Sequence, residues 1–350
     1  MPPTPTVWLL SAYRAASHGA WADWLVSSYP QIDWRRRELP GRHFRWRIRG
    51  NPLSWLDDLP DGTPERMIAT SMVDLSTLKG LHPRLAGVPT VYYFHENQFA
   101  YPVSPRQVSS IDPQMVQLYG ALAAYRLLFN SAFNRESFLD GVDALLDRLP
   151  DHLPRGLRRR LAGRSSVLPV PIEPVPPAAE RDEGLIVWSH RWEYDKAPGL
   201  FADALLRLAE SGADFRLALL GPRPAGPCPA LERIRERLAG HIVADGSVDA
   251  ASYRGLLGRA GIAVSTARHE FQGLAVLEAA SGGARPLVPD ALCYPEQYPP
   301  CYRYPPGDAD ALASRLCAWL RDGLPPPVDV SPWYASCLGG DWERVLTAPP

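Results

Sequence analysis

Two glutamates in the last third of the chain lie on either side of the start of an expected helix. Glu270 lies on a loop, and Glu278 lies inside the helix expected next. Gln272, Gly273 and Leu274 stand where that helix begins, and the N–H groups and dipole of a helix N-terminus favour a phosphate. A carboxylate at Glu278 can accept two ribose hydroxyls, and Glu270 can do the same for a sugar. A solvated or capping residue is a reasonable alternative for either glutamate alone, and a weaker one for Glu278, whose neighbours are apolar or small.

A second polar group, which includes Arg191 and Lys196, follows the first strand expected in the second half. A planar guanidinium and a compact ammonium both suit a diphosphate. Lys196 is one of two lysines in the chain, the other being Lys79, whereas arginine is frequent. Glu193 and Asp195 stand between them, so a surface loop of ion pairs is an equal alternative on spacing alone.

Two polar groups in the first half also follow expected strands. Burying consecutive polar side chains without partners is costly, so a run of four indicates a polar site. The run is His95, Glu96, Asn97 and Gln98. Ser17 and His18 lie in the turn after the first strand, where small residues let a ligand approach the backbone. The alternative there is an ordinary turn with Ser17 as the N-cap. Both groups are candidates for the polar lining of a cleft.

Residues 34–49 interleave arginines with aromatic residues. Such a stretch can neutralise phosphates and stack bases, and a solvated face is an equal alternative. Its second part supplies the candidate RNA-binding residues: Arg42, Arg45, Trp46, Arg47 and Arg49. For the second arginine cluster, residues 155–164, a solvated face is the preferred interpretation.

Alternating strands and helices must position these residues. The first half predicts strands over 7–10, 67–70, 90–94, 127–130 and near 167–170, with helices over 19–28 and 114–125. The proline-rich segment 171–182 is interpreted as a linker. After it we expect strands over 185–189, 215–220, 241–244, 261–265 and 286–288, and helices over 198–211, 231–238, 250–257, 274–280 and 308–321.

This alternation predicts an α/β protein with parallel sheets and crossover helices, in which ligands lie beyond the carboxyl ends of strands. We expect two Rossmann-like domains facing a cleft, residues 1–172 and 183–330. Residues 331–350 should form a C-terminal helix that packs back on the first domain.

Composition narrows the function. The 350 residues carry a net charge of −1, from 37 basic and 38 acidic residues, and 46% are hydrophobic. This excludes a disordered chain and any global attraction to nucleic acid or membrane, so RNA binding needs a local patch. The five cysteines show no zinc spacing, and no apolar run approaches the roughly eighteen residues of a membrane helix. We expect a cytoplasmic protein with no metal and no membrane contact.

Arg191, Lys196 and the two glutamates together resemble the donor site of family 4 retaining glycosyltransferases, which have the GT-B fold. The usual loop there reads Glu-Gly-Phe-Gly, whereas here it is Glu270-Phe271-Gln272-Gly273. That departure is similar to a narrower group, the tRNA-queuosine mannosyltransferases. The shared motifs keep their order along nearly the whole chain: Phe44-Arg45-Trp46-Arg47 in part, His95-Glu96-Asn97-Gln98, Tyr101-Pro102, Phe129-Asn130-Ser131, His269-Glu270-Phe271 and Tyr294-Pro295-Glu296. Ala15-Ala16 departs from the group, in which a glycine is common before the Ser-His pair.

The resemblance implies transfer of mannose from GDP-mannose, with retained configuration, to a cyclopentenediol hydroxyl of queuosine in the anticodon of an aspartate tRNA. It implies that Arg191 and Lys196 hold the diphosphate, Glu278 holds the ribose, Glu270 faces the mannose and His95 lies near its reacting end. It implies no metal or other cofactor, and a front-face reaction in which the leaving phosphate helps to deprotonate the acceptor. Two alternatives remain. One is a family 4 transferase that uses another nucleotide sugar and a small-molecule, lipid or polysaccharide acceptor. The other is a non-catalytic homologue that binds RNA or a nucleotide sugar.

Overall fold

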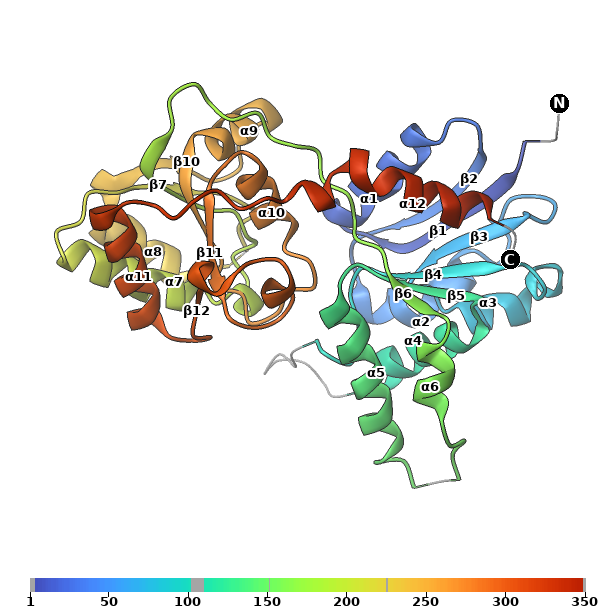
Figure 1. Ribbon diagram of the computed structural model, residues 1–350. Helices are drawn as coiled ribbons and strands as arrows, with labels where there is room; N and C mark the ends of the chain where they lie inside the picture. The colour runs from blue at the N-terminus through green and yellow to red at the C-terminus, as the bar shows by residue number, and fades with distance from the viewer. Residues whose placement is uncertain (1–3, 102–109, 151, 225, 349–350) are drawn as a thin grey trace. The chain divides into compact units, whose positions relative to one another are not determined.

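The computed structural model describes residues 4–101, 110–150, 152–224 and 226–348, so Pro102 of the Tyr-Pro motif lies outside the described residues. The chain forms two compact units (Figure 1). Unit 1 comprises residues 1–170 and 339–350, and unit 2 comprises residues 171–338. Each unit contains one six-stranded sheet, and the described strand pairs are parallel.

The sheet of unit 1 has the order β2-β1-β3-β4-β5-β6. Its strands are β1 (Thr6–Arg14), β2 (Asp33–Pro40), β3 (Arg66–Thr70), β4 (Thr90–Phe94), β5 (Arg126–Phe129) and β6 (Ser165–Val167). Its helices are α1 (Ala16–Ser28), α2 (Phe44–Ser54), α3 (Leu75–Leu81), α4 (Asp112–Ala123), α5 (Ala132–Leu146), α6 (Leu157–Ala162) and, from Gly339 onward, α12 (Ala335–Thr347).

Successive side chains of a strand point to opposite faces, and both faces of this sheet are buried. Tyr92 and Phe94 belong to a core cluster that includes side chains of α2 to α6. Tyr93 faces the other way, its ring stacked at 4.7 Å on Trp21 of α1 and 5.1 Å from Trp342 of α12. The C-terminal helix α12 therefore packs, through Trp342, on the face of the unit 1 sheet that α1 also covers (Figure 1). The expectation that this helix returns to the first half of the chain is confirmed.

The sheet of unit 2 has the order β12-β11-β10-β7-β8-β9. Its strands are β7 (Asp182–Trp188), β8 (Arg216–Leu219), β9 (Ile242–Asp245), β10 (Ala260–Val264), β11 (Arg285–Pro289) and β12 (Arg303–Tyr304). Its helices are α7 (Pro198–Glu210), α8 (Pro229–Arg237), α9 (Ala250–Arg259), α10 (Leu274–Ser281) and α11 (Ala309–Asp322). Val175 of the proline-rich segment is buried in a core cluster of this unit, and its N–H donates to Ser281. That segment packs on unit 2 and is not a bare linker.

Most predicted strands and helices occur within a few residues of their expected bounds. The strand expected near 167–170 lies earlier, at β6. β2 and α2 were not predicted, and both overlap the arginine-rich stretch. α3, α5 and α6 were not predicted either. Of the helices in the described ranges, none is both long and apolar enough to cross a membrane.

Candidate functional site

A buried lysine forms the centre of the site in unit 2. Lys196 follows β7 and is 7% exposed. Its ammonium lies 3.2 Å from a carboxylate oxygen of Asp195 and 3.2 Å from one of Glu270, and it donates to the carbonyl of His269 at 2.6 Å. Burial lowers the pKa of Lys196, but the two carboxylates outweigh that effect and the pKa is raised. The lysine therefore stays charged inside the protein.

Glu270 is the counterpart of this cation. Burial would raise its pKa, but Lys196, together with His190 and the N–H of Gly273, outweighs burial and the pKa falls to about 2. One carboxylate oxygen also accepts from the N–H of Phe271 at 3.0 Å. Glu270 is therefore a carboxylate at neutral pH, which can only accept hydrogen bonds and so suits the hydroxyls of a sugar.

The N-terminus of α10 follows Glu270 directly. Gly273 is its N-cap and has a φ of +68°, and a Cβ there would lie 2.9 Å from the ring of Tyr294. Glycine meets both demands, because it has no side chain and tolerates positive φ. Gln297 donates to the carbonyl of buried Gln272 at 2.7 Å, which fixes the preceding turn. Leu274 opens the helix, whose first N–H groups have no helical acceptor and suit a phosphate.

Glu278 lies one turn further into α10 and is half-buried. The hydroxyl of Tyr253, on α9, donates to its Oε2 at 3.1 Å, and the hydroxyl of Ser189 lies 3.0 Å from that of Tyr253. Burial raises the pKa of Glu278, and the bond from Tyr253 opposes that rise only in part. Tyr253 was not predicted, because nothing in its local sequence marks a contact with a residue 25 positions later.

Arg191 is the exposed member of the site. Its guanidinium lies 2.8 Å from Glu193 and 3.7 Å from Asp195. The loop of ion pairs suggested as an alternative is therefore present. It contains Arg191 and Lys196, the two residues expected to bind a diphosphate. Asp195 is 1% exposed and touches both Arg191 and Lys196, so it links the two cations.

Unit 1 has a neutral polar cluster at the carboxyl ends of β1 and β4. The rings of His18 and His95 stack at 4.2 Å, and Trp21 meets His95 edge-on at 4.7 Å. Burial lowers the pKa of His18 to about 4 and lowers that of His95 well below its usual value, with His18 adding to the second effect. His18 Nδ1 donates to the carbonyl of Tyr13 at 2.9 Å. The Nε2 of His95 is buried and has no hydrogen-bond partner among the described residues.

Asn97 uses its amide to shape the turn beside His95. Its nitrogen donates to the carbonyl of Asn134 at 3.1 Å and to the side-chain oxygen of Asn134 at 2.9 Å. Its oxygen accepts from the N–H groups of Phe99 and Ala100. A fully buried side chain with these partners supports the backbone.

The other predicted residues of this region remain accessible. Glu96 and Gln98 are half-buried, with 3.4 Å between their side chains. Ser17 is exposed in the first turn of α1. The N-cap of that helix is Ala15, so the alternative role of Ser17 as N-cap is wrong.

The first part of the arginine-rich stretch forms β2 and is paired with acids. Arg35 pairs with Asp33, and Arg36 pairs with Asp23 of α1 and with Glu38. The solvated, ion-paired interpretation holds for these residues. It also holds for much of residues 155–164, where Arg158 pairs with acids of α5 and Arg164 donates to carbonyls at the end of α4.

The second part of the stretch begins α2 at the carboxyl edge of the sheet. The ring of Phe44 lies 6.2 Å from that of Tyr13, which is near the end of β1 and whose carbonyl accepts from His18. Trp46 is 56% exposed, and its indole rests on Gly50, where a Cβ would lie 2.4 Å from the ring. Arg42 and Arg45 are exposed, and Arg47 is half-buried. Arg49 is bound at 2.9 Å to Asp74, whose side chain is 3% exposed.

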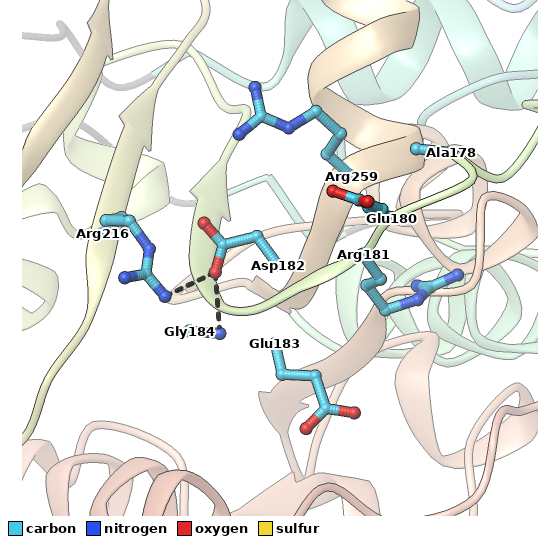
Figure 2. A pocket seen from close by; sticks show the side chains of 8 residues that line it. All are labelled: Ala178, Glu180, Arg181, Asp182, Glu183, Gly184, Arg216 and Arg259. Carbon is cyan, nitrogen blue, oxygen red and sulfur yellow. Dashed lines mark hydrogen bonds and ion pairs between the residues drawn. The ribbon is translucent and has the colours of Figure 1, made fainter.

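The hollow drawn in Figure 2 lies at the other edge of the unit 2 sheet, where β7 and β8 begin. Three of its charged groups have partners within the protein. Arg216 pairs with Asp182, and Arg181 donates to the carbonyls of Ala260 and Gly282. The carboxyl edge, with Lys196 and the two glutamates, is therefore the stronger candidate for a functional site. Nowhere in the described ranges do three or more His, Cys, Asp or Glu side chains group closely enough to hold a metal ion.

The fold and the site together define a GT-B glycosyltransferase. Residues 183–322 match the family described as glycosyl transferases group 1. A sucrose-phosphate synthase from Thermosynechococcus elongatus superposes with a TM-score of 0.71 at 12% identity, covering 99% of this chain and 100% of that one. Alr3699/HepE of Anabaena, solved in complex with UDP and glucose, gives 0.68 at 12% identity with the same coverage. These two likenesses show the fold.

The family follows from closer relatives. Residues 6–172 match the family described as tRNA-queuosine alpha-mannosyltransferase N-terminal. The tRNA-queuosine alpha-mannosyltransferase of Drosophila melanogaster is 34% identical over 333 residues, 91% of this chain and 87% of that protein. The chain belongs to the tRNA-queuosine alpha-mannosyltransferase family, and the resemblance inferred from its motifs is confirmed.

Proposed function

We propose that this protein transfers mannose from GDP-mannose, with retained configuration, to a cyclopentenediol hydroxyl of queuosine in the anticodon of a tRNA, that of aspartate by family resemblance. The observation that carries the proposal is the 34% identity with the Drosophila enzyme across 91% of the chain. The donor residues support it, since Lys196 and Glu270 are paired and buried as a charged site requires. Five free cysteines and a tRNA acceptor fit a cytoplasmic enzyme.

Unit 2 would bind the donor. Lys196 and Arg191 would hold the diphosphate, with Gln272, Gly273 and Leu274 at the start of α10 beside it. Glu278 would accept the two ribose hydroxyls, and Glu270 would accept hydroxyls of the mannose. As the bond between the sugar and the phosphate breaks, negative charge grows on the leaving GDP, and these fixed cations and helix N–H groups stabilise it.

Unit 1 would bind the acceptor. We assign to His95 the contact with the reacting end of the sugar or with the acceptor hydroxyl, as the family resemblance implies. Its buried Nε2 has no hydrogen-bond partner among the described residues, and stacking on His18 holds the ring in place. Both rings are neutral at pH 7, so neither adds charge. Ser17, Glu96 and Gln98 would line the acceptor side, with Asn97 supporting the turn. The new bond forms on the face that the phosphate leaves, and the acceptor proton passes to the leaving phosphate.

Arg42, Arg45, Trp46, Arg47 and Arg49 would form the tRNA surface beside His95. Phosphate contacts make affinity depend on salt, and stacking on an exposed indole contributes roughly 1–3 kcal/mol per base. Arg49 is a poor choice for mutation, because its loss would leave buried Asp74 unpaired. Replacing Arg42, Arg45 and Trp46 with alanine should weaken tRNA binding and flatten its salt dependence. Arg35→Ala on β2 is the matched control, and equal tRNA affinity in the triple variant would remove α2 from the interface.

The reaction is tested directly with two tRNAs of the same sequence, one carrying queuosine and one carrying guanosine. With GDP-mannose, mass spectrometry of the digested nucleosides should find mannosyl-queuosine only from the first tRNA. Lys196→Ala and Arg191→Ala should each weaken GDP binding, because a hydrogen bond to a charged group contributes about 1.5–3 kcal/mol. Transfer from UDP-glucose, or none from GDP-mannose, would contradict the proposal.

A further inference from the structure

Tyr253 joins three elements around the predicted ribose site. It comes from α9, its hydroxyl donates to Glu278 of α10 at 3.1 Å, and Ser189 at the end of β7 lies 3.0 Å away on the other side. Its ring packs against the core cluster that contains Val187 and Ala279. The hydroxyl is therefore held by a ring that cannot easily move.

The hydroxyl hydrogens of Ser189 and Tyr253 have one arrangement. A carboxylate only accepts, so the single hydrogen of the Tyr253 hydroxyl goes to Glu278. The tyrosine oxygen then accepts from Ser189, and the chain runs from Ser189 through Tyr253 to Glu278. One carboxylate oxygen of Glu278 and a lone pair of the other stay available for the two vicinal hydroxyls of a ribose.

Glu278 differs from Glu270 in the charge of its partner. Glu270 is paired with Lys196, whereas in the described part of the chain Glu278 forms no salt bridge. The positive charge of Arg254 lowers the pKa of Glu278 less than the bond from Tyr253 does. A salt bridge would compensate the carboxylate and weaken its bonds to neutral hydroxyls. A tyrosine fixes the rotation of the carboxylate and leaves its charge for the ligand.

We propose that Tyr253, supported by Ser189, is a positioning residue that fixes Glu278 to accept both hydroxyls of the donor ribose and so makes the site prefer ribonucleotides. This inference rests on the proposed function, because it takes the donor to be a nucleoside diphosphate sugar. It goes beyond that function by assigning the preference for ribose over deoxyribose to a residue that does not itself contact the donor.

The test compares the binding of GDP and 2′-deoxy-GDP by calorimetry. The wild type should prefer GDP. Tyr253→Phe should weaken GDP binding about tenfold, the value of one hydrogen bond to a charged group, and change 2′-deoxy-GDP binding much less. The KM for GDP-mannose should rise while kcat stays within about twofold. Ser189→Ala should act in the same direction and more weakly.

Tyr119→Phe, on an exposed tyrosine of unit 1, is the matched control and should bind both nucleotides like the wild type. A purely structural role for Tyr253 would lower both affinities together and leave their ratio unchanged, which would overturn the inference. A wild type that binds GDP without preferring ribose would also overturn it. A wild type that binds no GDP would instead refute the proposed donor.

Discussion

The pairing of Lys196 with Glu270 predicts a large energetic coupling inside unit 2. Lys196→Met removes the cation and keeps most of the side-chain volume, while Glu270→Gln removes the charge it faces. Lys196→Met alone leaves Glu270 buried without its cation, and breaking a buried pair from one side costs about 3–5 kcal/mol. The double variant removes both charges of the pair and should recover the part of the loss that comes from Glu270, whereas Asp195 stays without Lys196 in both variants.

The size of the coupling follows from the pKa of Glu270. Lys196 is 7% exposed and the side chain of Glu270 is 21% exposed, so solvent screens the pair little. The fall of this pKa from 4.5 to about 2 corresponds to about 3 kcal/mol. It is a net effect, in which burial opposes Lys196, His190 and the N–H of Gly273, so it sets the order of magnitude of the coupling. Because the folded pKa is depressed, this contribution is complete above pH 4.5 and is lost as the pH falls through about 2.

Amide hydrogen exchange of β7 and β10 reports unit 2 separately from unit 1. At pH 7 we expect the four proteins of the double-mutant cycle to show a coupling of about 3 kcal/mol in the exchange free energies of these strands. Additive effects, within about 0.5 kcal/mol, would refute the argument that the two charges hold each other inside the protein.

Three further outcomes are expected. Burial lowers the pKa of His18 to about 4, so the contribution of neutral His18 to stability is complete above pH 6.5, and about 3 kcal/mol is lost as the pH falls to 4. In urea titrations the stability of His18→Asn should depend less on pH than that of the wild type, and an equal pH dependence would contradict this. Ala197 has a φ of +46°, so Ala197→Gly should raise stability by up to about 1 kcal/mol in thermal melts, whereas Ala209→Gly within α7 should lower it. Excess chelator should leave transfer unchanged, because Lys196, Arg191 and α10 supply the positive charge; a need for Mg²⁺ or Mn²⁺ would show otherwise.

The sheets were predictable because their strands are short apolar runs between helical patterns. β2 was missed because it is an edge strand of mostly polar, partly exposed side chains, without the apolar run that marks the others. Its arginines are matched by Asp23 of α1 and Asp58, and only the folded chain brings those acids beside them. α2 was missed because its arginines and exposed Trp46 look like an RNA-binding loop as much as a helix.

The charged residues of the donor site could be found from their spacing after strands. The partners of these charged residues could not be found, because they come from distant parts of the sequence or fitted another interpretation. Tyr253 reaches Glu278 only because α9 lies beside α10, and Trp21 reaches His95 only across the sheet face. Asp195 was considered only as part of an alternative, a surface loop of ion pairs, yet its burial beside Lys196 makes it part of the site. Sequence spacing identifies side chains that need partners, and tertiary packing decides which partners they receive.

The two units solve the burial of polar groups in opposite ways, and the difference predicts how transfer depends on pH. Unit 2 buries opposite charges against each other, with the pKa of Glu270 at about 2 and that of Lys196 raised. Unit 1 buries imidazoles in their neutral form, with the pKa of His18 at about 4 and that of His95 also lowered.

None of these four groups changes its protonation between pH 6.5 and 9, and the proposed reaction passes the acceptor proton to the leaving phosphate. The single-turnover rate of transfer, with both substrates saturating, should therefore stay within about twofold over that range. His95→Gln, which keeps a neutral hydrogen-bonding group, should lower the rate without adding a pH dependence. A wild-type rate that falls with an apparent pKa near 7, together with loss of that transition in His95→Gln, would show that His95 removes the acceptor proton and that the phosphate does not.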